Sequence, residues 1–241
     1  MQIPEQRQKG SIRSLKLQFL REMERNYTIL AIRRLPMTTV STIVDLGAHV
    51  GMFSLLARFL HPRAEIFAVE PNPDNYEMLN RNVQFLDIHT INCAIGIQGN
   101  MYFHSKQKKS TSFKYTAEIN DDPVTSYTLP GFFDQYPHIG RNGLYIKVDI
   151  EAAECYFYKD SKVADLLRSC VGADFDLHMN VEKLNAYCDW LREKLEDTHD
   201  IEQYGWKGSN LVSNSFTAVL LRKDVPRLRY VVKGNEVVYD G

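Results

Sequence analysis

The sequence lacks several features that mark particular classes of protein. Its 241 residues hold no apolar run near the roughly 18–20 residues that span a bilayer, and the first ten residues lack the apolar core of a signal peptide. The formal net charge is only −1, which does not favour binding to nucleic acid or to an anionic membrane. We therefore expect a cytoplasmic protein with no membrane span and no nucleic-acid partner.

Cysteine is scarce as well. The four cysteines are widely scattered, and no two of them form a C-x-x-C pair. This number and spacing argue against a disulfide framework and against a structural zinc site. We expect the four thiols to be reduced and mostly buried.

Strand-like and helix-like segments do alternate along the chain. TIVDL and EIFAVE are short β-branched runs, and each is followed by an apolar stripe with helical spacing. The pattern returns in LYIKVDIEAAE and VGADFDLHM and ends in DIEQYGW and SFTAVLLRK. Such alternation is typical of βαβ units around a parallel sheet. We predict an α/β fold with seven sheet strands and helices between most of them.

Three further segments lie around or within this pattern. Residues 1–38 are predicted to form an N-terminal helical extension, since apolar residues recur with helical spacing from Ser11 to Arg34. Residues 39–223 would form the main domain, within which 96–143 is an irregular insertion with no clear helix. Residues 224–241 are expected to form a hairpin that turns at Gly234-Asn235.

The stretch VDLGAHVGMFS forms the predicted turn between the first strand and its helix. Gly47 and Gly51 allow positive φ angles there and let a ligand approach the backbone. Their G-x-x-x-G spacing differs from the G-x-G-x-x-G pattern of dinucleotide-binding proteins. A tight turn can also need glycine for steric reasons alone, so the turn by itself leaves both interpretations open.

An acidic residue closes the next strand. EIFAVE ends in Glu70, at a position where a carboxylate can accept hydrogen bonds from the two hydroxyls of a ribose. Pro71-Asn72-Pro73 then begins the next helix, because proline is tolerated in a first turn. Together the turn and the acid predict a nucleoside-containing ligand that lies across two strand ends.

Taken in order, VDLGAHVGMFS, FAVEPNPDNYEMLNRN, NCAIG, TSYTL and YIKVDIEAAE resemble the FkbM-type branch of the class I methyltransferases that use S-adenosylmethionine. The resemblance implies a Rossmann-like seven-stranded sheet with helices on both faces, whose last strand, SFTAVLLRK, runs antiparallel. It also implies methyl transfer, commonly to a hydroxyl of a sugar, a glycolipid or a polyketide.

The same resemblance places the cofactor. Around its methionine part would lie Asp45, Gly47, Ala48, His49 and Gly51. Around its adenosine would lie Glu70 with Asn72 beside it, and Asn92, Cys93 and Ala94. Asp149 would lie nearest the sulfonium and the methyl acceptor. The chain departs from the family at Ala152, where a glycine is usual.

Three residues are candidates for assisting the acceptor: Asp149, Glu151 and His178. An alcohol is a poor nucleophile while it is protonated, so one of them can act as a base. Alternatively the three bind a divalent metal, which we do not expect, or serve as structural hydrogen-bonding groups. Because side chains alternate along a strand, Asp149 and Glu151 are predicted to share one side of an extended segment.

Other functions remain open at this stage. The acceptor can be nucleic acid or protein instead of a small molecule, although the charge does not favour this. Loss of catalysis in a module that still binds the cofactor is a further alternative, suggested by Ala152. The aromatic residues of the irregular insertion either stack on the acceptor or anchor the segment to the domain; these are Tyr127, Phe132, Phe133 and Tyr136.

Overall fold

The computed structural model describes residues 32–101, 123–151, 153–206, 215–233 and 236–240. Most of the predicted N-terminal helix lies outside these residues, as do Ala152 and the predicted hairpin turn at 234–235. The statements below concern the described residues.

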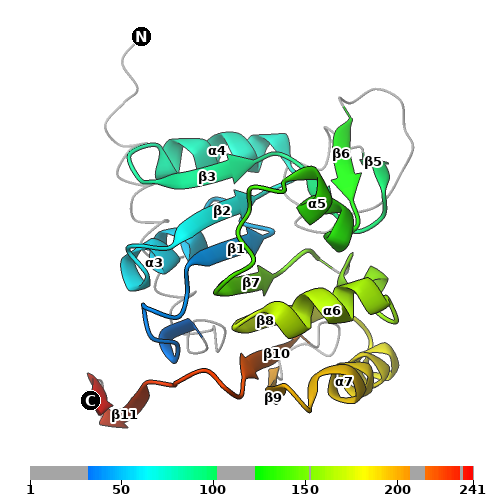
Figure 1. Ribbon diagram of the computed structural model, residues 1–241. Coiled ribbons are helices and arrows are strands. Elements are labelled where there is room, and N and C mark those ends of the chain that lie inside the picture. Colours follow the sequence, from blue (N-terminus) through cyan, green and yellow to red (C-terminus); the bar gives the residue numbers. More distant parts are fainter. Residues whose placement is uncertain (1–31, 102–122, 152, 207–214, 234–235, 241) are drawn as a thin grey trace.

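A seven-stranded sheet forms the centre of the molecule (Figure 1). Its strands, from one edge to the other, are β3 (Ile88–Ile91), β2 (Glu65–Val69), β1 (Thr42–Leu46), β7 (Leu144–Val148), β8 (Gly172–His178), β10 (Ser215–Arg222) and β9 (His199–Trp206). The first five are parallel, and β10 is antiparallel to both of its neighbours. The predicted sheet is confirmed, including the antiparallel direction of SFTAVLLRK.

Helices cover both faces of this sheet. Helix α3 (Met52–Leu60) and helix α4 (Pro73–Val83) pack on one face, where Ala57 belongs to the same buried cluster as Ile43, and Leu79 to the same cluster as Ala68. On the other face lie α5 (Leu129–Gln135), α6 (Ser161–Ser169) and α7 (Val181–Leu195). This division follows from strand alternation, since neighbouring residues of a strand point to opposite faces.

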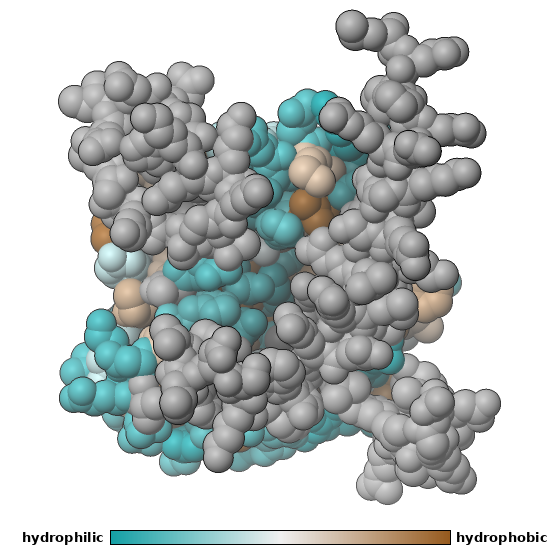
Figure 2. All heavy atoms as spheres, turned by 180° about the vertical axis from the view of Figure 1, so that it is seen from behind, coloured by the Kyte–Doolittle hydropathy of each residue, from teal (hydrophilic) through white to brown (hydrophobic). Residues whose placement is uncertain are grey.

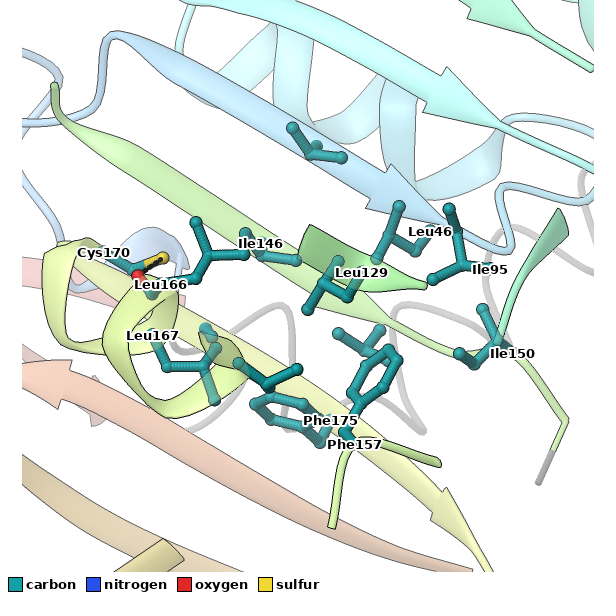
Figure 3. Packing of buried hydrophobic residues seen from close by; sticks show 14 of the residues in the cluster. Leu46, Ile95, Leu129, Ile146, Ile150, Phe157, Leu166, Leu167, Cys170 and Phe175 are labelled. Carbon is teal, nitrogen blue, oxygen red and sulfur yellow. Dashed lines mark hydrogen bonds between the residues drawn. The ribbon is translucent and has the colours of Figure 1, made fainter. Parts of the chain in front are cut away.

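The larger core lies under α5, α6 and α7. Figure 3 shows Ile146 of β7, Phe175 of β8 and Leu167 of α6 directed into the same interior, and all three are buried. A short 3₁₀ helix, η1 (Ala153–Tyr156), follows β7. The next buried side chain, Phe157, joins the same core and thereby ties down the segment that leaves β7.

The segment between residues 96 and 143 is more regular than the sequence predicts. It contributes β5 (Gly99–Met101) and β6 (Val124–Tyr127), which form a three-stranded sheet with β4 (Ala94–Ile95). It also contains α5, although no clear helix was predicted there. Thr128 caps α5 by accepting a hydrogen bond from Gly131 N at 3.1 Å. A helix of only seven residues is too short to give a clear apolar period in the sequence.

The four aromatic side chains that were singled out in this segment divide into two groups. Phe132 and Phe133 are fully buried and therefore anchor α5 to the core. Tyr127 and Tyr136 remain half-buried, with ring centroids 6.2 Å apart in an edge-on arrangement. Of these four described residues, only the two tyrosines are thus exposed enough to meet a ligand.

The C-terminal residues form the predicted hairpin. Strand β11 (Arg229–Lys233) pairs antiparallel with β12 (Glu236–Asp240). No helix in the part of the chain that the structure describes is long and apolar enough to cross a membrane. From behind, hydrophobic surface of the described residues appears as small separate areas (Figure 2).

Candidate cofactor and acceptor site

The ends of β1, β2, β7 and β8 meet at one edge of the sheet because these strands are parallel. The chain runs outward from β1 through β2 to β3 and returns to place β7 on the other side of β1. Such a reversal of strand order is where open α/β sheets bind ligands. The predicted site residues lie at this edge, and we describe them from the β1 turn outward.

Both glycines of the β1 turn are needed for steric reasons within the protein, whether or not a ligand binds. Gly47 has φ of 79°, and a Cβ atom there would lie 1.7 Å from the carbonyl oxygen of Asp149. Gly51 has φ of 90°, and its Cβ would lie 2.7 Å from Leu79 Cδ1 of α4. The steric interpretation therefore accounts for both positions. The close approach joins the β1 turn to the residue that follows β7.

The backbone N–H groups of this turn are bonded within the protein. Gly47 N and Ala48 N both donate to the carbonyl oxygen of Val69 at 2.9 Å, and Gly51 N donates to Ala48 O at 2.8 Å. His49 N donates to Glu70 Oε2 at 2.8 Å. Dinucleotide-binding turns need such groups free for a pyrophosphate, so this turn suits a ligand without phosphates.

Glu70 lies directly after β2 and is only 4% exposed. Its carboxylate accepts hydrogen bonds from His49 N, from Asn72 N at 2.9 Å and from Asn75 Nδ2 at 3.3 Å. Burial raises the pKa of Glu70, while the two backbone N–H groups act in the opposite direction. Since a carboxylate offers about four lone-pair positions, these three bonds leave room for a ligand hydroxyl.

The other residues predicted around the adenosine have structural roles as well. Asn72 caps α4, with Oδ1 accepting from Asp74 N at 2.9 Å and Asn75 N at 3.3 Å. Asn92 Nδ2 donates to the carbonyl oxygens of Glu70, at 2.8 Å, and Pro71. The side chains of Cys93 and Ala94 are buried, and burial raises the pKa of the Cys93 thiol to about 12.

Asp45 is fully buried inside the sheet face that α3 covers. Its Oδ2 accepts a 2.6 Å hydrogen bond from Ser54 Oγ, and its Oδ1 lies 3.3 Å from Lys147 Nζ on the neighbouring strand. Lys147 Nζ also donates to Gly47 O at 3.1 Å. The Asp45 carboxylate thus faces Ser54 and Lys147, which are both protein groups.

Lys147 connects the two parts of the site. Its Nζ lies 3.4 Å from Asp149 Oδ2 in addition to its contact with Asp45. Burial by itself lowers the pKa of Lys147, but the carboxylates of Asp149 and Asp45 outweigh burial and raise it. The lysine therefore stays charged, and it is unsuited to accept a proton. Its side chain forms salt bridges with both carboxylates.

The three predicted catalytic residues are brought together. Ligand atoms of Asp149, Glu151 and His178 all lie within 4.8 Å of one another, and each side chain is half-buried. His178 Nε2 lies 3.2 Å from Asp149 Oδ1 and 3.8 Å from Asp176 Oδ2. Asp149, which follows β7, and His178, which ends β8, come from neighbouring parallel strands.

The predicted extended conformation after β7 is wrong. The strand ends at Val148, and Glu151 lies in a turn with a φ of 52°. A residue with left-handed backbone angles does not continue a strand. The alternation of side chains along a strand therefore does not explain why the Glu151 and Asp149 side chains lie on the same side. The turn after β7 brings the two carboxylates together instead.

Charge interactions set the protonation of this cluster. The hydrogen bond to Asp149 raises the pKa of His178 to about 9, and burial opposes this effect. Burial also disfavours the ionised form of Asp149, yet Lys147 and His178 outweigh it and lower its pKa to about 2. For Glu151, burial raises the pKa. At neutral pH His178 is therefore an imidazolium and cannot act as a base in this state.

One buried acid was not predicted from the sequence. Glu154 in η1 is fully buried, and its Oε1 accepts a hydrogen bond from Ile150 N at 2.9 Å. Burial raises the pKa of Glu154 to about 7. The bond holds the backbone between Asp149 and Glu151. No sequence signal separates this glutamate from an ordinary surface residue of a short helix.

The strand order, with one antiparallel strand next to the β9 edge, defines the class I methyltransferase fold. Within that class, residues 45–157 match the family model described as "Methyltransferase FkbM domain". The match confirms the resemblance found in the sequence.

Two similar fungal proteins are also named methyltransferases. Methyltransferase 1 of Beauveria bassiana (strain ARSEF 2860) is 27% identical over 171 residues, which cover 61% of this chain and 65% of the relative. Methyltransferase sdnD of Sordaria araneosa is 47% identical over 45 residues, or 19% of this chain and 17% of the relative. The matches thus span less than two thirds of either relative.

Solved structures of similar shape include methyltransferase FkbM from Methylobacillus flagellatus KT, at 12% identity and a TM-score of 0.49, with 75% of this chain and 44% of that chain covered. A SAM-dependent methyltransferase from Agrobacterium tumefaciens has 10% identity and a TM-score of 0.49, with 84% and 62% covered. The assignment of the fold rests on the strand order and not on these likenesses.

Proposed function

We propose that this chain is an S-adenosylmethionine-dependent methyltransferase that methylates a hydroxyl of a sugar, a glycolipid or another small-molecule acceptor. The observation that carries the proposal is the position of Glu70 at the end of β2, beside the β1 turn, within an FkbM domain. The names of the two fungal relatives support methyl transfer.

The donor set at the β1 and β2 ends fits this cofactor. Glu70 keeps acceptor capacity for a ribose hydroxyl, and the N–H groups of the turn that are bonded within the protein suit a cofactor without phosphates. Helix α3 begins at Gly51 with no side-chain cap, so its positive end is open to a carboxylate such as that of methionine. We assign the adenosine to Glu70 and the methionine part to the turn.

S-adenosylmethionine, when bound, supplies a methyl group on a cationic sulfur. The residues of the chain must then hold the acceptor in line, exclude water and help the hydroxyl lose its proton. Asp149 lies closest to the turn, since its carbonyl oxygen packs against Gly47. We therefore place the acceptor hydroxyl beside Asp149, Glu151 and His178.

We assign the rest of the acceptor pocket to residues 96–143, as an insertion in a methyltransferase domain that spans residues 39–223. Tyr127 and Tyr136 are half-buried there. Burial raises the pKa of Tyr136, and the neighbouring Cys93, Tyr127 and Tyr76 act in the same direction. The two rings thus lie near the strand end where the adenine is assigned, on a surface suited to stacking.

Calorimetry with S-adenosylhomocysteine, the demethylated cofactor, tests cofactor binding. We expect one site per chain and at least about tenfold weaker binding for Glu70→Gln, because the amide cannot accept all three N–H bonds. Glu77→Gln is the matched control, since Glu77 lies exposed on α4 and pairs only with Arg81 among the described residues. Absence of binding by the folded wild-type protein would contradict the proposal.

The kind of acceptor needs a separate experiment. Incubation with labelled S-adenosylmethionine and a mixture of small-molecule, RNA and protein fractions should place the label in small molecules, as the low net charge favours. Label in RNA or protein would replace the proposed acceptor class. Binding without transfer to any fraction would instead favour a module that has lost catalysis.

A further inference from the structure

Asp149, Glu151 and His178 form the one cluster of potential metal ligands among the described residues. The cluster mixes an imidazole with two carboxylates, which is a common ligand set for divalent cations. Its three members come from two neighbouring strand ends and a turn, and all are half-buried. The ligand atoms are therefore held close together and remain accessible from solvent.

The spacing of these atoms fits a cation. His178 Nε2 and Asp149 Oδ1 are 3.2 Å apart. Two ligands at right angles, each about 2.1 Å from a metal, lie roughly 3 Å apart. All three ligand atoms fall within 4.8 Å, so small side-chain movements bring them to one ion, which takes the place of the His178 Nε2 proton and releases that proton to solvent. Three protein ligands leave further coordination positions open for water or for oxygen atoms of an acceptor.

Neighbouring groups orient the cluster without occupying it. Lys147 Nζ lies 3.4 Å from Asp149 Oδ2 and forms an ion pair with it. The other oxygen of Asp149, Oδ1, faces His178. Glu154 Oε1 holds Ile150 N, and the other carboxyl oxygen of Glu154 is fully buried with no hydrogen-bond partner. Outer groups of this kind fix the ligands of metal sites.

The chemistry of the proposed acceptor supplies a reason for a cation. A hydroxyl that loses its proton becomes negative, and next to Asp149 and Asp176 that charge is repelled. A divalent cation offsets the carboxylates and stabilises the deprotonated oxygen.

We propose that Asp149, Glu151 and His178 bind one divalent cation, of the Mn²⁺ or Mg²⁺ type, whose open positions take the oxygen atoms of the acceptor. An acceptor with two neighbouring oxygen donors, such as a vicinal diol, fits this arrangement best. The role of the cation rests on the proposed function, whereas its binding does not.

The test titrates Mn²⁺ alone into the chelator-treated full chain and follows free Mn²⁺ by electron paramagnetic resonance. We expect one site in the wild-type protein. In Glu151→Gln and in His178→Ala we expect at least about tenfold weaker binding, because loss of an outer partner alone costs about 10–100-fold. Glu182→Gln is the matched control, as Glu182 is exposed in the first turn of α7. Circular dichroism checks that each variant is folded.

Absence of Mn²⁺ binding by the wild-type protein at millimolar concentration overturns the inference. Equal binding by the wild type and both ligand variants overturns it as well, because the ion then lies elsewhere. Calorimetry with S-adenosylhomocysteine in chelator, on the same preparation, keeps the two proposals apart. Cofactor binding without Mn²⁺ binding removes the cation only, and Mn²⁺ binding without cofactor binding removes the methyltransferase assignment only.

Discussion

The two halves of the site are built by different means. At the ends of β1 and β2, backbone geometry dominates: glycines with positive φ, bonded N–H groups and a carboxylate that accepts two backbone N–H groups and one side-chain amide. At the ends of β7 and β8, charged side chains dominate, and their protonation depends on one another. The first half is thus rigid in shape, and the second is adjustable in charge.

This difference separates two tasks. A cofactor of constant structure can be held by a fixed backbone turn. An acceptor and its proton need groups whose charge responds to what is bound. Lys147 lies between the halves, as it contacts Asp45 on one side and Asp149 on the other.

The largest effect is expected from the backbone half. Gly47→Ala places a Cβ 1.7 Å from the Asp149 carbonyl oxygen at a φ of 79°, so the turn and the residue after β7 must move apart. We expect a loss of at least about 4 kcal/mol in the free energy of unfolding, measured by urea denaturation. Gly99→Ala is the control, because Gly99 also has positive φ but no atom within 4 Å of its Cβ. Similar losses in both variants would mean that strain in φ, and not the contact, sets the cost.

The next effect concerns the link between the halves. Lys147→Met removes the cation beside Asp45, whose carboxylate is fully buried. We expect a loss of about 3–5 kcal/mol in unfolding free energy at pH 7, since an unpaired charge then stays buried. The exposed Lys162→Met is the control. A loss below about 1 kcal/mol would show that Asp45 does not need the lysine.

The smallest of the three expected effects concerns Glu154, beside the charged residues that follow β7 and end β8. Because the pKa of Glu154 is raised from 4.5 to about 7, the folded state holds its proton at pH values where the unfolded state has lost it. The contribution of Glu154 to the free energy of unfolding is therefore largest below pH 4.5, and it is lost as the pH rises through about 7. We compare the free energy of unfolding at pH 5 and at pH 8, measured by urea denaturation in the presence of chelator. Over this range we expect the wild type to lose on the order of 2–3 kcal/mol more unfolding free energy than Glu154→Gln does. Parallel pH profiles of the two proteins would contradict this.

The sequence predicted best what depends on local pattern. Alternating strands and helices and the carboxylate at the end of EIFAVE follow from periodicity and order along the chain, and the strands are where they were expected. The antiparallel direction of SFTAVLLRK was instead implied by the family resemblance. Asp149, Glu151 and His178 were expected to lie together, and they do, but their arrangement was not predicted. Glu151 lies in a left-handed turn, and nothing in DIEAAE marks that conformation.

Burial was the harder property to predict. Asp45 was expected at the ligand, yet its carboxylate lies inside the sheet with Ser54 and Lys147. Three of the cysteines are buried as expected, whereas Cys155 is exposed. Glu154 is fully buried because η1 turns it toward Ile150 N. Each of these outcomes depends on contacts between segments that are distant in the sequence or on a turn without a sequence signature.

The contact of Gly47 with Asp149 also matters for protein engineering. Asp149 N donates to Leu46 O at 3.0 Å, so the two segments are joined by a backbone bond as well as by packing. An exchange of segments between homologous proteins that transfers 149–154 alone would leave a foreign backbone against the native turn. Chimeras should therefore carry residues 45–51 and 147–154 from one parent as a single graft.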